Sequence, residues 1–138
     1  MAYTIAWRMG PQVLEVAFTG EVTESDLIYS SEAITDILAF ADAPVHILYN
    51  GLDVRDFPRS MIVLKRALRR FCVLPTMGWL FFSGFNTPDL RYVANAIMQV
   101  KLRDFKSVHS LEDLDLILHQ VDPSLQTTTD KTSVQAPH

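Results

Sequence analysis

The sequence predicts an α/β domain in which helices pack on a mixed β-sheet. Three observations lead to this prediction. The chain has 138 residues, of which 49% are hydrophobic and 20% charged, and this suits one globular domain. Two segments of strand-like pattern open the chain and are separated by a brief turn. After them, short apolar segments alternate with segments whose apolar residues recur at helical spacing.

The opening strands are expected at residues 3–8 and 13–18. Both segments alternate in the manner of a strand, and Met9-Gly10-Pro11-Gln12 between them is typical of a turn. Such a short connection predicts an antiparallel hairpin.

A helix is expected from about residue 24 to residue 40. Thr23 and Asp26 have the spacing of a capping box, and Ala43-Pro44 ends the helical pattern. A short strand follows at residues 45–49. It is expected to end at Asn50-Gly51, a typical turn dipeptide, and to be followed by a loop over residues 52–57.

The second helix is expected to begin with Pro58 at its first position. Its buried stripe is predicted to consist of Met61, Leu64, Ala67, Leu68 and Phe71. Residues 77–82 form the most apolar strand. Because a strand that is apolar on both sides is buried on both faces, we place it inside the sheet.

The third helix is expected to be capped by Thr87, with Pro88 at its first position. A fifth strand at residues 105–108 and a fourth helix from Ser110 complete the domain. The predicted order is therefore ββαβαβαβα, with a five-stranded mixed sheet and four helices in residues 1–121. The Thr-rich, aperiodic residues 122–138 are expected to be a disordered tail.

This order resembles the STAS domain (sulphate transporter and anti-sigma-factor antagonist), over residues 3–121. The best local match is Phe105-Lys106-Ser107-Val108-His109-Ser110-Leu111-Glu112-Asp113-Leu114. The resemblance implies a bacterial regulatory or protein-interaction module that is not an enzyme. Anti-sigma-factor antagonists carry Asp-Ser-Ser/Thr-Gly after the third strand and are phosphorylated there. Here the stretch is Asp56-Phe57-Pro58-Arg59, so that switch is not transferred, and modification of the displaced Ser60 stays open.

Polar residues gather where the third and fourth strands end. In open α/β sheets ligands bind at such crevices, and amides at helix starts can hold anions. The alternative is ordinary turn and cap chemistry. The candidate residues there are Asn50, Asp53, Asp56, Ser60, Ser83, Asn86 and Thr87.

Half of the twelve basic residues fall between positions 55 and 70, and we expect Arg59, Arg66 and Arg70 among them to bind a partner. An acidic protein is the favoured partner and an anionic membrane surface the less favoured one. Nucleic acid is not expected, because the net charge is −4. The alternative is a solvated helix face that is offset by Glu24, Glu32 and Asp36.

Four aromatic residues suggest a second function, a carrier or sensor of a small apolar or lipid-like ligand, with Trp79, Phe81, Phe82 and Phe85 lining its cavity. A third hypothesis is an enzyme that uses Asp53 or Asp56. If helices cover only one sheet face, the other face is expected to form a homodimer through Tyr3, Ile5, Trp7, Trp79 and Phe81.

No nucleotide-binding, metalloprotease, CxxC or nucleophile-elbow motif occurs in the sequence. We therefore expect no catalytic residue, metal or cofactor. Without a signal-peptide pattern, a cytoplasmic location is expected. The favoured prediction is a non-enzymatic, homodimeric STAS-like regulatory module.

Overall fold

The computed structural model describes residues 2–85, 87–100 and 105–107. Its centre is one five-stranded sheet in the order β1-β2-β3-β4-β5. β1 and β2 are antiparallel, and every later neighbour is parallel, which confirms the predicted mixed sheet and opening hairpin. The strands are β1 (Tyr3–Met9), β2 (Val13–Glu21), β3 (Val45–Asp56), β4 (Met77–Gly84) and β5 (Phe105–Ser107).

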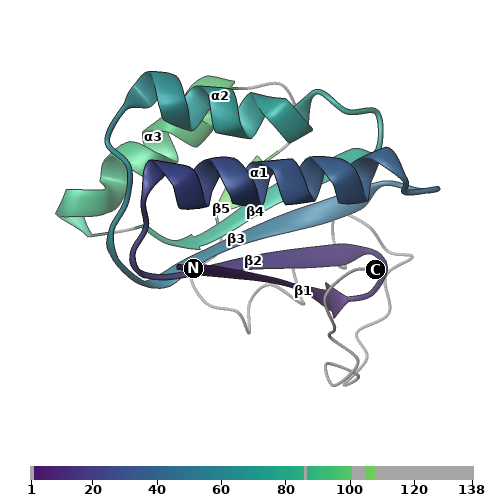
Figure 1. Cartoon of the computed structure of the whole chain (residues 1–138), viewed down its shortest axis with the longest axis horizontal. Coiled ribbons are helices and arrows are strands. Elements are labelled where there is room, and N and C mark those ends of the chain that lie inside the picture. Colours follow the sequence, from purple (N-terminus) through teal and green to yellow (C-terminus); the bar gives the residue numbers. More distant parts are fainter. Residues whose placement is uncertain (1, 86, 101–104, 108–138) are drawn as a thin grey trace.

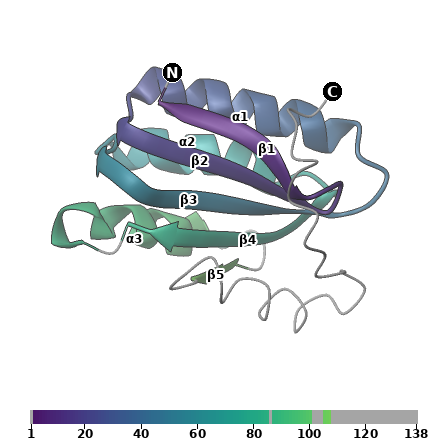
Figure 2. The same ribbon diagram turned by 90° about the horizontal axis from the view of Figure 1, so that it is seen from below.

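Helices lie over one face of this sheet, as Figures 1 and 2 show from two sides. They are α1 (Glu24–Ala39), α2 (Met61–Cys72) and α3 (Arg91–Val100), with a short 3₁₀ helix, η1 (Pro88–Leu90), before α3. Adjacent parallel strands need such crossovers, which here place α1 and α2 side by side. The helix predicted from Ser110 and the tail predicted for 122–138 lie outside the described residues.

The first helix begins as the sequence predicts. The Thr23 side chain accepts a hydrogen bond from the Asp26 amide at 3.1 Å, and Asp26 accepts one from the Thr23 amide at 3.0 Å. That backbone hydrogen bond is the main reason that the pKa of Asp26 lies below its ordinary value. The capping box fixes where the chain turns from β2 into α1.

β3 is longer than predicted, and the expected loop at 52–57 is wrong for residues 52–56. Asn50-Gly51 does not turn the chain, because Asn50 pairs with Ser83 and Gly51 with Gly84 in β4. Beyond them β3 continues to pair with β2, where Asp53 lies beside Thr19 and Asp56 beside Glu21. The register of this β2–β3 pairing shifts twice along the way. Backbone pairing on both sides outweighs the local preference of Asn-Gly for a turn.

Two helix starts also differ from the sequence prediction. α2 begins at Met61, because the Ser60 side chain accepts a hydrogen bond from the Val63 amide at 3.3 Å. Pro58 precedes the helix and is buried together with Phe57. At the third helix, Thr87 makes no side-chain cap, and Pro88 begins a 3₁₀ turn rather than α3. Packing of Phe57 in the core holds the chain extended past Pro58.

The core lies between the helices and the facing side of the sheet. A row of contacting aromatic side chains runs through the core. Phe18 contacts Tyr49 and Phe57 edge-on, and Phe57 contacts Phe85, with ring centroids 5.1–5.2 Å apart in each pair. Such pairs add about 0.5–1.5 kcal/mol each beyond the burial of their area. Burial raises the pKa of the Tyr49 hydroxyl strongly, so this side chain is neutral.

The patch expected on the other sheet face is not assembled. Tyr3, Ile5 and Trp7 pair with Phe18, Val16 and Leu14, and they pack against the core beneath the helices. They therefore lie on the helix-covered face, because paired residues in a ladder share a face. Trp79 and Phe81 stack on each other, with centroids 6.1 Å apart.

Two glycines at the paired ends of β3 and β4 let the strands approach closely. Gly84 has φ 84°, and a Cβ there would lie 2.6 Å from the Leu52 amide nitrogen and 2.7 Å from the Gly51 carbonyl oxygen. At Gly51 a Cβ would meet the Phe85 ring. The two strands can therefore approach this closely only because Gly51 and Gly84 carry no side chain.

Gly84→Ala is expected to lower the free energy of unfolding by at least about 2 kcal/mol, through left-handed strain and the backbone clash together. Gly20→Ala is the matched control, because Gly20 has φ 64° but a Cβ there meets only the Arg55 side chain at 3.5 Å. The control should lose only about 1 kcal/mol. Urea denaturation measures both, and equal losses would contradict the close approach.

Candidate functional site

The polar residues expected at the strand ends form two separate groups, of which the first surrounds the start of α2. Arg59 Nη2 lies 3.4 Å from Asp56 Oδ1, and its guanidinium stands 5.4 Å from the centre of the Tyr92 ring. The Tyr92 hydroxyl donates a hydrogen bond to the Phe57 carbonyl. Burial, more than any charge, raises the pKa of Tyr92. These contacts fasten the segment before α2 to α3.

The second group lies within the sheet. Asn50 donates to Glu15 at 2.9 Å and accepts a hydrogen bond from the Leu52 amide at 3.1 Å, and Glu15 also pairs with Arg8 at 3.3 Å. Ser83, the neighbour of Asn50 in β4, is buried. Asn50 thus completes a polar network between strands.

Asp53 and Asp56, the carboxylates among the remaining strand-end candidates, do not form the acid/base pair considered from the sequence in the described part of the chain. Asp53 and Thr87 are exposed, and Asp56 is engaged with Arg59. Asn86 lies outside the described residues. No hydrogen bond joins Asp53 to Asp56 in the described part of the chain, so the acid/base pair considered from the sequence has no geometric support there.

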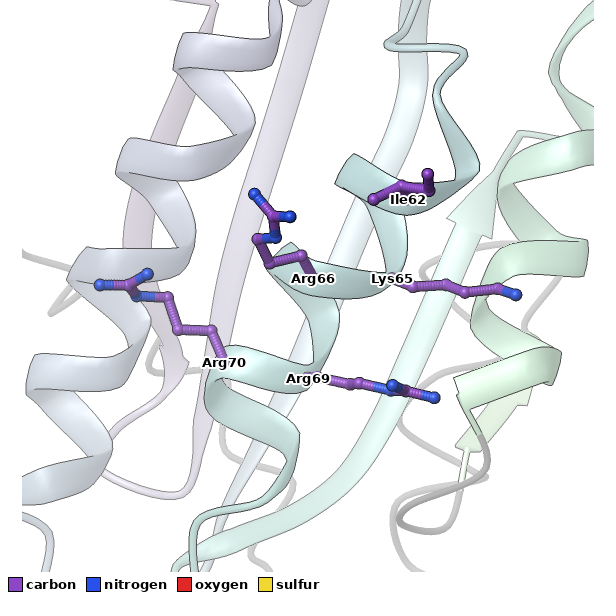
Figure 3. A pocket seen from close by; sticks show the side chains of 5 residues that line it. All are labelled: Ile62, Lys65, Arg66, Arg69 and Arg70. Carbon is purple, nitrogen blue, oxygen red and sulfur yellow. The ribbon is translucent and has the colours of Figure 1, made fainter.

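The outer side of α2 carries the strongest concentration of charge. Its buried stripe consists of Leu64, Ala67, Leu68, Phe71 and Cys72, so the intervening cations face outward. Arg66 and Arg70 extend toward α1, whereas Lys65 and Arg69 extend toward α3 (Figure 3). We call these four cations the α2 basic face.

Carboxylates neutralise this basic face only in part. Arg70 Nη2 lies 3.4 Å from Glu32 Oε2 on α1, and both side chains are about half exposed. Within the described residues, Lys65, Arg66 and Arg69 have no ion pair. Glu24 and Asp36, expected as further neutralising residues, form none either. An exposed pair contributes only about 0–1 kcal/mol, so the face stays strongly cationic.

Two hollows adjoin the basic face and share Arg66 and Arg70. The outer one has a volume of about 520 Å³ and is lined by Ile62, Lys65, Arg66, Arg69 and Arg70. The inner one has a volume of about 220 Å³ and lies between the helices, lined by Ile28, Ser31, Val63, Arg66, Ala67 and Arg70. We call the inner one the α1/α2 pocket.

Sequence reasoning identified Arg66 and Arg70 but missed the neutral residues beside them. Ile62 is 70% exposed and Ile28 38% exposed, although both are large and apolar. Ile62 lies outside the buried stripe of α2, and that position was a signal available in the sequence. The contribution of Ile28 and Ser31 needs the relative placement of α1 and α2, which periodicity does not give.

The four aromatic residues of the carrier hypothesis do not line one cavity. Phe82 and Phe85 belong to the core under the helices. Phe81 alternates with Phe82 along β4 and therefore points to the opposite face, where it stacks on Trp79. Neither hollow beside α2 contains any of the four.

The described residues contain neither a membrane-spanning helix nor a metal-binding cluster. None of their helices has the length and hydrophobicity that a membrane span requires. No three His, Cys, Asp or Glu side chains among them are grouped closely enough to hold a metal ion.

Known proteins resemble this chain in structure but not detectably in sequence. No family model matches it. No curated protein matches it either. The solved structure of the anti-sigma factor antagonist SpoIIAA in its unphosphorylated form is similar, with a TM-score of 0.59 and 12% identity, over 84% of this chain and 96% of that one.

A second similar structure is an uncharacterised protein of the DUF3478 family from Shewanella loihica, which has a SpoIIAA-like fold. Its TM-score is 0.59 and its identity 16%, over 83% of this chain and 93% of that one. The chain therefore has a STAS-like fold. At these identities the likeness establishes the fold alone.

Ser60 positions the helix that carries the basic face, which makes its capping role testable. Ser60→Ala is expected to lower the free energy of unfolding by about 1 kcal/mol, because the Val63 amide loses its acceptor. Ser60→Asp keeps an acceptor and should retain the stability of the parent chain. Urea denaturation followed by circular dichroism measures both, and an unchanged alanine variant would contradict the cap.

Proposed function

We propose that this chain is a cytoplasmic, non-enzymatic interaction module that binds a protein partner through the α2 basic face. The observation that carries the proposal is the α2 basic face itself, on which Arg70 alone has a carboxylate partner among the described residues. A STAS-like fold is compatible with such a role, since SpoIIAA is an anti-sigma factor antagonist. We extend this likeness to the present chain and propose that its role is regulatory.

The energetic cost of placing like charges together on α2 favours a functional reason for the basic face. Lys65 with Arg69, and Arg66 with Arg70, are like charges one helical turn apart, and each pair costs a few tenths of a kcal/mol. The first turn of α2 contains no acidic residue, which would have complemented the helix dipole. The chain has more acidic than basic residues and a net charge of −4, yet its cations are concentrated on this helix. An acidic partner would relieve the repulsion.

The strand-end residues take a supporting role in this proposal. Asp56, Arg59 and Ser60 hold the start of α2, and Asn50 holds the sheet beneath it. We assign none of them to direct contact with the partner.

Arg66→Glu combined with Arg70→Glu is expected to abolish retention of the partner protein in a pull-down from cells that express the chain. The physical reason is the reversal of charge at the centre of the binding surface. The partner is identified by mass spectrometry with the unaltered chain and then quantified with each variant.

Arg66→Glu alone should already weaken retention, and Arg55→Glu is the matched control for this single variant, because Arg55 is an exposed cation on β3 rather than on α2. It makes the same change in net charge and should leave retention unaltered. Equal retention by the Arg66/Arg70 variant and the unaltered chain would overturn the proposal. Equal losses of retention with Arg66→Glu and Arg55→Glu would overturn it too, because the binding would then be nonspecific charge attraction.

Homodimerisation stays a prediction, although three of the five residues expected at its interface, Tyr3, Ile5 and Trp7, lie under the helices. Sedimentation velocity at micromolar concentration is expected to give twice the mass of the 15.6 kDa chain. A monomeric mass would contradict it.

A further inference from the structure

The α1/α2 pocket has the size of a site for one side chain. Its volume is about 220 Å³, below the roughly 300–1,000 Å³ of pockets that take small-molecule ligands. Its walls come from α1 (Ile28 and Ser31) and from α2 (Val63 and Ala67), and Arg66 and Arg70 stand beside them. A single side chain that fills this volume must satisfy mainly apolar walls, the buried Ser31 hydroxyl and a cationic rim together.

The rim favours a carboxylate. A guanidinium offers paired donors whose geometry matches a carboxylate, and such charge-assisted hydrogen bonds are about twice as strong as neutral ones. Arg70 has Glu32 at 3.4 Å, whereas Arg66 has no such partner among the described residues. Arg66 is therefore the cation available to an incoming acidic group, with Arg70 beside it.

The surroundings of the pocket favour a protein over a nucleic acid. Ile62 is exposed one turn before Arg66, and Ile28 is partly exposed across the pocket. A phosphate backbone makes no use of these apolar side chains. The net charge of −4 also opposes a long polyanion, because nucleic-acid-binding domains carry a basic balance.

Resting on the function proposed above, we propose that the partner presents an acidic amphipathic helix, one of whose carboxylate side chains enters the α1/α2 pocket and pairs with Arg66. Its apolar side chains lie on Ile28 and Ile62. A further carboxylate one turn along it meets Arg70, because Arg66 and Arg70 are separated along α2 by the rise of four residues, about 6 Å, as carboxylates at i and i+4 are on the partner helix. Helix-in-groove recognition uses such periodic anchors.

Fluorescence anisotropy with short synthetic helical peptides tests this pairing on the full chain. The probe peptide carries Glu at i and i+4 and Leu between them on the same face. One comparison peptide replaces Glu by Gln, and another replaces Leu by Ser. The probe is expected to bind, both comparison peptides should bind at least about tenfold more weakly, and about 1 M NaCl should weaken the probe through screening.

Variants of the chain assign the contacts. Arg66→Gln should raise the Kd of the probe about tenfold, the loss expected for a hydrogen bond to a charged group. Ile62→Ser should raise it several-fold without altering the net charge. Arg55→Gln is the matched control for Arg66→Gln and should leave the Kd unchanged.

Several results would overturn the inference. They are no binding of the probe at millimolar concentration, equal binding of the Glu and Gln peptides, or equal effects of Arg66→Gln and Arg55→Gln. Binding of a single-stranded oligonucleotide or of phosphatidylserine vesicles in place of the peptide would also overturn it. If the pull-down partner still depends on Arg66 and Arg70 in these cases, the binding surface stands and only its acidic-helix chemistry is wrong.

Discussion

Burial of one stripe of α2 is the constraint on which the candidate site depends. Leu64, Leu68 and Phe71 are at most 2% exposed, and burying a side chain of this kind stabilises the fold by about 1.5–3 kcal/mol. Repulsion between neighbouring cations costs only a few tenths of a kcal/mol per pair. The stripe therefore determines the rotation of the helix about its axis, and the arginines and the lysine face outward whatever their mutual repulsion.

The same packing explains why a pocket lies beside these cations. Ser31 of α1 and Ala67 of α2 are buried and small, and both line the gap between the two helices. Small residues at a helix contact leave volume that larger ones would fill. Because Val63 and Ile28 border this volume and Arg66 reaches over it, an apolar hollow and a charged rim arise from one helix pair.

The sequence predicted the sheet, its hairpin and the helices of the described residues, since these depend on periodicity. It also located Arg66 and Arg70, because helical spacing separates them from Leu64 and Leu68. It failed where tertiary contacts override local preference: Asn50-Gly51 continues a strand because β4 pairs with it, and Pro58 stays outside α2 because Phe57 is packed in the core. The pocket could not be predicted, because its walls combine side chains of two helices, and the nearest of these, Ser31 and Val63, lie more than 30 positions apart in the sequence.

The proposed partner surface lies away from the strand end, and Phe57 supplies a physical reason for this. The motif expected from the STAS resemblance places Ser-Ser/Thr directly after its Asp. Here Phe57 and Pro58 follow Asp56, and the Phe57 ring is 2% exposed between Phe18 and Phe85. A segment packed into the core cannot serve as an exchangeable surface without unfolding its surroundings. The outer side of α2 is fastened at its start by Ser60 and Arg59 and needs no such movement, so it can present charge while the core stays closed.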